Sequence, residues 1–385
     1  MEDVTIISYP STEQYQLLSL TEGRSRYMLP FCGKFRVVDF ILGNATQSGA
    51  RRTIIYSDVE DDLAAYVNRY GPFEDEKFPP VKVLTGGFSD ARFTYNLIMD
   101  SNTSFYIIYN GDNPSLIDFA KLMQRFRKSR AHSVLYKLKF NGKATMAHRV
   151  LVVRQRVLLD VIDRAIKDRS SSPSVFEMII NNLINKGIRK DTFPIYCWPI
   201  HSVAEYYRHN MEILQNKEMV DEIFYNSLLE SKIKFYGYAS LGGNANVKGS
   251  FISDGCEIHG VVENSILFPG VHVGEKAVIR DSIVLPYNRI GEGARITRSI
   301  IDERTEEEPE NQVWVNIGRC RIGTDTRQLK SSTYPRALYN SVTLIGKNCT
   351  LPEGVNVGGA SYVASGKTEI DFQKKKYIYD GLSLD

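Results

Sequence analysis

A short basic stretch near the N-terminus holds the residue types best suited to binding chemistry. Four cations lie within thirteen residues: Arg24, Arg26, Lys34 and Arg36. Guanidinium groups match phosphate oxygens two at a time and stay charged at neutral pH. The stretch therefore indicates a site for a phosphorylated ligand, with a solvated basic loop, or arginines that tie domains together through carboxylates, as alternatives. Arg298, far along the chain, is a weaker candidate for the opposite wall of such a site.

The elements that must position these cations change in type near residue 235. Before it, short apolar runs alternate with amphipathic segments, which predicts a mostly parallel sheet covered by helices on both faces. Strands are expected at Val4–Ser8, Thr53–Tyr56, Phe105–Tyr109 and Ser133–Lys137, and helices at Asp61–Tyr70, Leu116–Arg130, Val157–Asp168 and Val203–Gln215. Ser202 and Glu205 have the spacing of a capping box at the start of the last helix.

From residue 236 to 385, one aliphatic residue recurs about every six positions. The series runs through Val247, Ile252, Ile258, Val273, Ile279, Val284, Ile290, Ile296, Ile301, Ile317, Ile322, Ile345, Leu351 and Val357. Gly, Asp, Asn or Pro occupies the corners between these positions. Such hexapeptides predict a left-handed parallel β-helix, in which each side of a triangular coil points one aliphatic side chain inward. An antiparallel sandwich would show alternation with period two instead.

Three segments interrupt or end the repeat. The acidic segment 303–312 and the polar segment 324–340, which contains Pro335, are expected to leave the coil as loops. Solenoid loops often carry ligand or partner contacts, and solvated decoration is the alternative. The tail Asp371–Asp385 is expected either to cap the solenoid or to form a flexible end.

The composition excludes several classes of protein. The chain has 385 residues with 43% apolar and 24% charged residues, a formal net charge of +3 and a sequence pI near 8.4. Its basic residues are scattered, so nucleic acid is not an expected partner. The five cysteines are odd in number and widely spaced, which argues against a disulfide framework or a zinc motif. Neither a signal peptide nor a membrane span is apparent, and we expect a cytoplasmic protein without a membrane partner.

The basic stretch and several further motifs resemble the ADP-glucose pyrophosphorylase (glucose-1-phosphate adenylyltransferase) family. The similar segments occur in the family's order: Leu17–Thr21, Leu29–Asn44, Ser48–Arg52, Phe88–Ala91, Tyr109–Asp112, Glu205–Leu214 and Val261–Val271. The resemblance spans almost the whole chain. It implies a nucleotidyltransferase domain over residues 1–235 and a β-helix domain over residues 236–385.

The departures from the family pattern concern catalysis. Residues 8–16 align with the family's glycine-rich phosphate loop but contain no glycine, and Gln16 replaces the loop arginine. Arg26 replaces a lysine, no EKP motif is present, and the second metal-binding aspartate is missing. The resemblance leaves a nucleotide-site remnant of Gln16, Ser89, Asp90, Gly111 and Asp112, in which Asp112 alone is a candidate Mg²⁺ ligand. One carboxylate holds magnesium poorly, so Mg²⁺ is expected only if nucleotide binding is retained.

The resemblance therefore favours a regulatory subunit without catalysis, active in glycogen synthesis. Its implied partners are a catalytic subunit, in a heterotetramer, and a phosphorylated metabolite that binds Arg24, Arg26, Lys34, Arg36 and Arg298. In the resembling family, the positions of Arg24 and Arg36 help to bind such effectors. Two alternatives stay open: an active nucleotidyltransferase that makes ADP-glucose or another sugar nucleotide, and a scaffold unrelated to glycogen.

Overall fold

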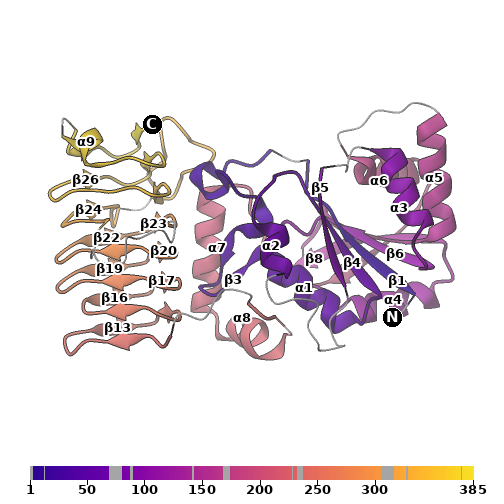
Figure 1. Ribbon diagram of the computed structural model, residues 1–385, viewed down its shortest axis with the longest axis horizontal. Coiled ribbons are helices and arrows are strands. Elements are labelled where there is room, and N and C mark those ends of the chain that lie inside the picture. Colours follow the sequence, from indigo (N-terminus) through magenta and orange to yellow (C-terminus); the bar gives the residue numbers. More distant parts are fainter. Residues whose placement is uncertain are drawn as a thin grey trace.

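A computed structural model describes residues 3–12, 14–68, 80–86, 90–140, 143–167, 174–227, 229–231, 237–304, 316–326, 328–373 and 375–385. The chain forms two units that lie side by side (Figure 1). The N-terminal unit is an α/β domain, and the C-terminal unit is a stack of flat coils. The expected boundary at residues 235 and 236 falls outside the described residues and stays a prediction.

The N-terminal domain is built on a seven-stranded mixed sheet in the order β10-β8-β9-β6-β1-β4-β5. Its strands are β1 (Val4–Ser8), β4 (Arg52–Ser57), β5 (Val81–Thr85), β6 (Phe105–Tyr109), β8 (Ser133–Phe140), β9 (Lys143–Arg154) and β10 (Arg189–Pro194). Only β9 runs antiparallel to its neighbours in this sheet, β6 and β8. β1 and β6 are the central strands. Loops at their carboxyl ends are where ligands bind in open α/β sheets.

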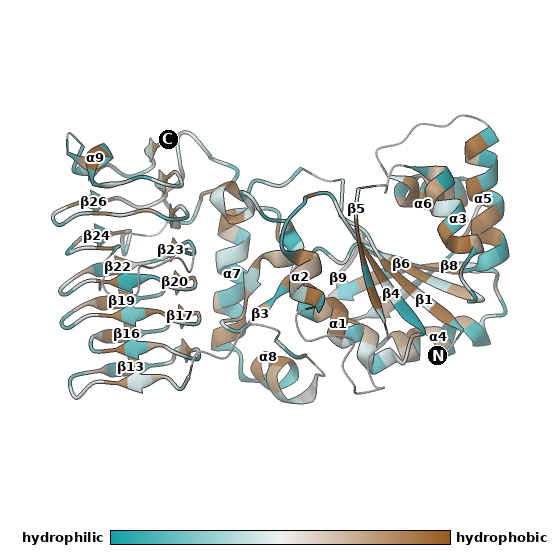
Figure 2. Cartoon of the chain, viewed as in Figure 1, coloured by the Kyte–Doolittle hydropathy of each residue, from teal (hydrophilic) through white to brown (hydrophobic). Residues whose placement is uncertain are grey.

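Helices cover both faces of this sheet, as the alternation predicts. The helices α1 (Val37–Ser48), α2 (Leu63–Asn68) and α4 (Phe119–Lys128) share one buried cluster with the sheet. The helices α3 (Ala91–Met99), α5 (Gln155–Lys167) and α6 (Val175–Asn185) share the other. Figure 2 shows the apolar strands between the two helical layers.

Helix α4 illustrates how the local sequence specifies these elements. Four apolar side chains at helical spacing are buried: Phe119, Leu122, Met123 and Phe126. Asp118 caps its N-terminus by accepting from the backbone N–H of Lys121 at 2.7 Å. Basic residues fill its last turn, where they complement the helix dipole.

The C-terminal unit is a three-sided parallel β-helix. Its sides have the strand orders β12-β15-β18-β21, β13-β16-β19-β22-β24-β26-β28 and β14-β17-β20-β23-β25-β27-β29. These strands are β12 (Ser240–Leu241), β13 (Asn246–Lys248), β14 (Phe251–Ile252), β15 (Glu257–Ile258), β16 (Val261–Glu263), β17 (Ile266–Leu267), β18 (His272–Val273), β19 (Val278–Arg280), β20 (Ile283–Val284), β21 (Arg289–Ile290), β22 (Arg295–Thr297), β23 (Ser299–Ile301), β24 (Arg321–Ile322), β25 (Thr343–Ile345), β26 (Asn356–Val357), β27 (Tyr362–Val363), β28 (Tyr377–Ile378) and β29 (Ser383–Leu384). Every aliphatic residue of the expected series packs in or against the coil's internal core.

The tail acts as a cap rather than a free end. Its strand β28 pairs with β26, and β29 pairs with β27, so the tail adds a last coil. Helix α9 (Glu369–Phe372) places Phe372 in the internal core.

The polar segment 324–340 is more than solvated decoration. Within it, Ala337 and Leu338 are buried between the two domains. The carbonyl of Ala337 accepts from the backbone N–H of Ala204 at 3.0 Å. Most of segment 303–312 lies outside the described residues.

Helix α7 (Val203–Gln215) lies against the β-helix and joins the two domains (Figure 1). Outward-facing residues of one β-helix side, Ile266, Ile283, Ile300 and Leu344, share a core with α7 and with the hairpin of β2 (Pro30–Phe31) and β3 (Phe35–Arg36). This side is therefore apolar on both faces, which the six-residue pattern alone did not predict.

The cap of α7 differs from the expected one in one bond. The side chain of Ser202 accepts from the backbone N–H of Glu205, as predicted. The Glu205 carboxylate, however, accepts from the backbone N–H of His201 at 2.9 Å rather than from Ser202. The reciprocal half of the capping box is thus shifted by one residue.

The domain also contains helix α8 (Lys217–Asp221) and a short π-helical turn at Glu222–Asn226. It further contains the antiparallel pair β7 (Ser115–Leu116) and β11 (Tyr196–Cys197), and two 3-10 turns at Leu18–Thr21 and Arg26–Met28. No helix in the described ranges is long and apolar enough to cross a membrane.

Candidate functional site

The carboxyl end of β6 holds an ion pair at the expected nucleotide site. Asp112 follows this strand, and its carboxylate pairs with the guanidinium of Arg26. The side chain of Asp112 is 1% exposed and that of Arg26 is 11% exposed. Asp112 also accepts from the backbone N–H of Ser11 at 2.6 Å and from the amide of Asn113 at 3.3 Å. The one surviving candidate for a metal ligand is therefore bound to the chain's own groups.

Aromatic rings hold the Arg26 guanidinium in place. It lies 3.2 Å from the ring centroid of Tyr15. Tyr15 stacks on His201 with ring centroids 5.4 Å apart and an interplanar angle of 4°. Nδ1 of His201 lies 3.2 Å from the Glu205 carboxylate on α7. Cation–π contact with the partly buried ring of Tyr15 adds to the ion pair, so the arginine is held from two sides.

The segment that aligns with a phosphate loop begins with three buried residues at the end of β1 and directly after it. Ser8, Tyr9 and Pro10 are buried, and the hydroxyl of Ser8 lies 3.1 Å from that of Tyr27. The Tyr9 hydroxyl donates to Glu177 on α6 at 2.9 Å. Burial, together with the nearby Glu177 charge, raises the pKa of Tyr9 well above its ordinary value. A glycine loop would leave backbone N–H groups and space for phosphates here, whereas in this chain the N–H of Tyr9 donates to the carbonyl of Tyr109 and that of Ser11 donates to Asp112.

These residues do not fit Mg²⁺. Magnesium requires octahedral oxygen ligands, several of them usually water, and one or two carboxylates. Asp112 is buried, and its oxygens already contact Arg26, Ser11 and Asn113. A guanidinium beside the carboxylate supplies the positive charge that a metal would bring.

Three other residues of the predicted remnant, Gly111, Asp90 and Gln16, lie within the described residues. A side chain at Gly111 would lie 2.3 Å from the Ser8 hydroxyl, so only glycine fits there. Asp90 caps α3 by accepting from the backbone N–H groups of Arg92 and Phe93. The backbone of Gln16 pairs with Ser202, and its side chain is exposed. Ser89 lies outside the described residues.

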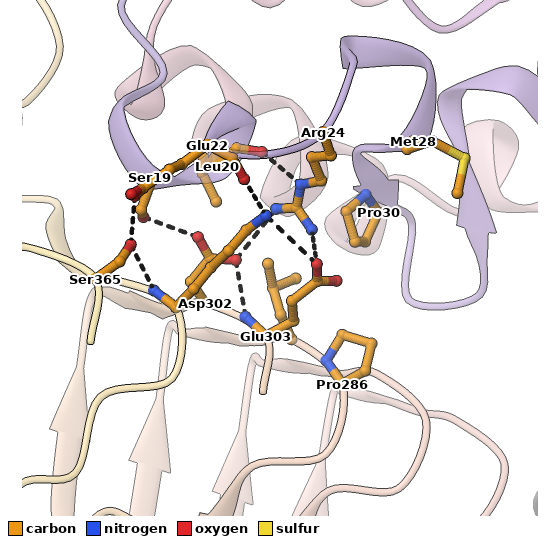
Figure 3. Close-up of polar contacts among 12 residues, drawn as sticks. Ser19, Leu20, Glu22, Arg24, Met28, Pro30, Pro286, Asp302, Glu303 and Ser365 are labelled. Atoms are coloured by element: carbon orange, nitrogen blue, oxygen red, sulfur yellow. Dashed lines mark hydrogen bonds and ion pairs between the residues drawn. The ribbon is translucent and has the colours of Figure 1, made fainter. Parts of the chain in front are cut away.

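Arg24 is the main polar link between the two domains (Figure 3). Its guanidinium pairs with Asp302 at 3.1 Å and with Glu303 at 2.6 Å, both at the end of β23. Its Nε donates to the carbonyl of Leu20 at 2.6 Å, and Asp302 also accepts from the hydroxyl of Ser19 at 2.8 Å. The side chains of Arg24 and Asp302 are 5% and 0% exposed. For Arg24, the structure thus matches the alternative in which an arginine ties the domains through carboxylates.

The electrostatics of this link centre on Glu303. Burial raises the pKa of Glu303, but the charges of Arg24, Arg36 and Lys347 outweigh it and hold the pKa below its ordinary value. Lys347 lies 3.6 Å from Glu303 and donates to the carbonyl of Glu22 at 2.5 Å. For Asp302, burial dominates over the charge of Arg24 and raises the pKa. Glu303 therefore provides the anion for a cluster of three cations.

The remaining predicted cations lie apart from this cluster or only partly within it. Arg36 donates to the carbonyl of Met28, and its guanidinium lies 5.6 Å from the ring of Tyr66. Lys34 is exposed at the turn between β2 and β3. The basic stretch thus divides: Arg26 lies on the nucleotide side, Arg24 pairs with Glu303, and Arg36 influences Glu303 through its charge alone.

Arg298 lines a separate pocket of about 420 Å³ between α7 and the β-helix. The other walls include Tyr207, Arg208 and Glu212 from α7 and Asn340 from the polar segment. Nε of Arg298 is buried and has no hydrogen-bond partner among the described residues. Arg208 pairs with Glu212 at 3.1 Å, so one of the two arginines that line the pocket already has a carboxylate partner.

Sequence reasoning did not identify the residues that contact Arg24 and Arg26. Tyr15 lies in the segment 8–16 that was identified only as an altered loop, Glu303 was expected to begin a loop, and Asp302 received no assignment. No local spacing connects Ser19 or Arg24 with Asp302, because the contacts join residues 283 and 278 positions apart. Asp302 also matches the Asp that the repeat places at its corners, so its residue type gave no separate signal.

Comparisons with known proteins agree with this architecture. Residues 234–325 match the family described as GlmU-like, C-terminal hexapeptide. The relatives are named glucose-1-phosphate adenylyltransferase. One from Pseudothermotoga lettingae is 27% identical over 93% of this chain and 93% of its own length. One from Clostridium kluyveri is 23% identical over 68% of this chain and 79% of its own, and one from Clostridium perfringens is 23% identical over 68% and 78%. The matched hexapeptide family agrees with the β-helix, and the chain is homologous to these adenylyltransferases.

Replacing Arg24 with methionine is expected to destabilise the protein strongly. Arg24→Met leaves Asp302 and Glu303 without their main partner in a buried site, and breaking such a pair costs about 3–5 kcal/mol. The free energy of unfolding is measured by urea denaturation. Adding Asp302→Asn and Glu303→Gln should recover part of the loss. The matched control is Arg164→Met on α5, whose pair with Asp160 is about half exposed and should cost less than about 1 kcal/mol. Equal effects at Arg24 and Arg164 would contradict the role given to Arg24.

Proposed function

We propose that this chain is a regulatory, non-catalytic subunit of ADP-glucose pyrophosphorylase that acts in glycogen synthesis. The observation that carries the proposal is the ion pair of Arg26 with Asp112 at the carboxyl end of β6. It supports the proposal because adenylyl transfer requires Mg²⁺ and preorganised cations at the triphosphate. Here the cation and the carboxylate neutralise each other.

A nucleotide that binds with Mg²⁺ at this site would have to displace the Arg26 guanidinium from Asp112. Binding Mg²⁺ and ATP at Asp112 requires that Arg26 leave a site in which both side chains are nearly buried. Breaking a buried pair costs about 3–5 kcal/mol, equivalent to a loss of roughly two to three and a half orders of magnitude in affinity. The phosphates would also meet the buried residues Ser8, Tyr9 and Pro10 rather than glycine N–H groups.

The purified chain is expected to be inactive on its own. With ATP, glucose 1-phosphate and Mg²⁺, it should form no ADP-glucose above a blank without enzyme, since the groups that would act as a unit are absent together. Formation of ADP-glucose is followed by chromatography. Turnover near about 1 s⁻¹, within the usual range for enzymes, would support the alternative of an active nucleotidyltransferase. If the chain is a regulatory subunit, co-expression with a catalytic paralogue should give a complex whose two chains purify together.

For the phosphorylated effector, we propose the pocket that Arg298 lines rather than the cluster around Glu303. Arg298 has a buried Nε with no partner among the described residues, whereas Arg24 already pairs with Asp302 and Glu303. A guanidinium group binds phosphate oxygens two at a time, and Arg208, which pairs with Glu212, lines the same pocket.

Phosphate or a sugar phosphate is therefore expected to raise the melting temperature of the chain through this pocket. Arg298→Ala should abolish the shift, and Glu303→Gln should leave it unchanged. Thermal melting with inorganic phosphate and fructose 1,6-bisphosphate measures both. If Glu303→Gln instead enlarges the shift and Arg298→Ala has no effect, the effector binds between Arg24 and Arg36. Linkage requires that a regulatory ligand also change the affinity for the catalytic subunit, which a titration of that partner measures.

A further inference from the structure

Three metal-ligating side chains gather on the outer face of the first β-helix side. Glu257 on β15 lies opposite His272 on β18, one coil further along, in the register of the parallel pair. His259 follows β15 and points from the same face, because alternate residues of a strand share a face and Ile258 between them is in the core. The three side chains come from two successive coils and from none of the sites described above.

The side chains face one another through their ligand atoms. Nε2 of His259 lies 2.7 Å from one Glu257 oxygen, and Nδ1 of His272 lies 3.2 Å from the other. One ligand atom from each residue lies within 4.8 Å of the other two. The two rings are 5.7 Å apart, between centroids. Only small side-chain rotations separate this arrangement from one that surrounds a single ion.

The neighbouring backbone leaves room for this cluster. A Cβ at Gly242 would lie 2.4 Å from Nδ1 of His259, so the ring occupies space that any other residue at 242 would need. The glycine thereby lets the His259 ring lie beside the coil and turn its Nε2 toward Glu257. The cluster remains open to solvent: His259, His272 and Glu257 are 34%, 23% and 51% exposed.

We propose that Glu257, His259 and His272 bind a divalent transition-metal ion, with Zn²⁺ as the best match. Two imidazole nitrogens and one carboxylate are zinc ligands at about 2.0–2.2 Å, and the exposed side leaves a fourth position for water. Mg²⁺ and Ca²⁺ select all-oxygen sites and do not match this set. The bound ion would join two successive coils near the first end of the β-helix.

The surrounding charges permit such binding. Glu257 brings one negative charge beside the two imidazole rings. The nearest cation in register is Arg289 on β21, on the side of His272 away from Glu257. Lys276, on the next corner, is paired with Glu292 at 2.7 Å.

Zinc titration of the full chain, freed of metal by chelation, tests the site. We expect one Zn²⁺ per chain by calorimetry and a rise in melting temperature that follows mass action. His259→Ala and His272→Ala should each weaken zinc binding at least about tenfold, because each removes one of three ligands. Both side chains point outward, so the variants should melt like the wild type in chelator. Bound Co²⁺ should show the intense visible absorption of tetrahedral coordination.

The matched control is His132→Ala, which removes an exposed histidine of the α/β domain and should leave zinc affinity unchanged. Mg²⁺ in large excess should not compete. Zinc binding that survives both single replacements at 259 and 272, or that Mg²⁺ displaces, would overturn the proposal. The assay reports no catalysis or effector binding, so its outcome is independent of the proposed function.

Discussion

The pair between Arg26 and Asp112 determines how the nucleotide side of this protein is organised. Both charges lie out of water, and neither is stable there without the other. Tyr15 and His201 stack beside the guanidinium, and the N–H of Ser11 binds the carboxylate, so the loop after β1 is held against the end of β6. A site that would otherwise need a metal to balance its carboxylate is balanced within the chain.

At the domain interface, buried charges are again balanced within the chain, here with cations in excess around a carboxylate. Arg24, Arg36 and Lys347 form a concentration of positive charge, and Glu303 is the anion among them. Around this polar centre, apolar side chains of α7 and of one β-helix side form a continuous core. The interface is thus both apolar and charge-compensated, which fixes the position of α7 relative to the coils.

The sequence predicted the architecture well because period and polarity are local properties. The six-residue series identified the inward residues of the β-helix, and the strands at Val4–Ser8 and Phe105–Tyr109 were placed correctly. The partners of Arg24 and Arg26 could not be predicted, because they depend on contacts across nearly three hundred and across eighty-six positions respectively. The outward apolar residues Ile266 and Ile283 were missed for a similar reason: the pattern shows which residues enter the coil, not which face meets another domain.

Calorimetric titration with ATP and Mg²⁺ tests the central claim most directly, because it asks whether the Arg26 and Asp112 pair excludes the nucleotide. The wild type should release no heat of specific binding at ATP concentrations up to about 1 mM, the upper end of usual substrate affinities. The fold should be intact in the same sample, as judged by its melting transition. Saturable binding of one Mg·ATP per chain with a micromolar dissociation constant would contradict the account.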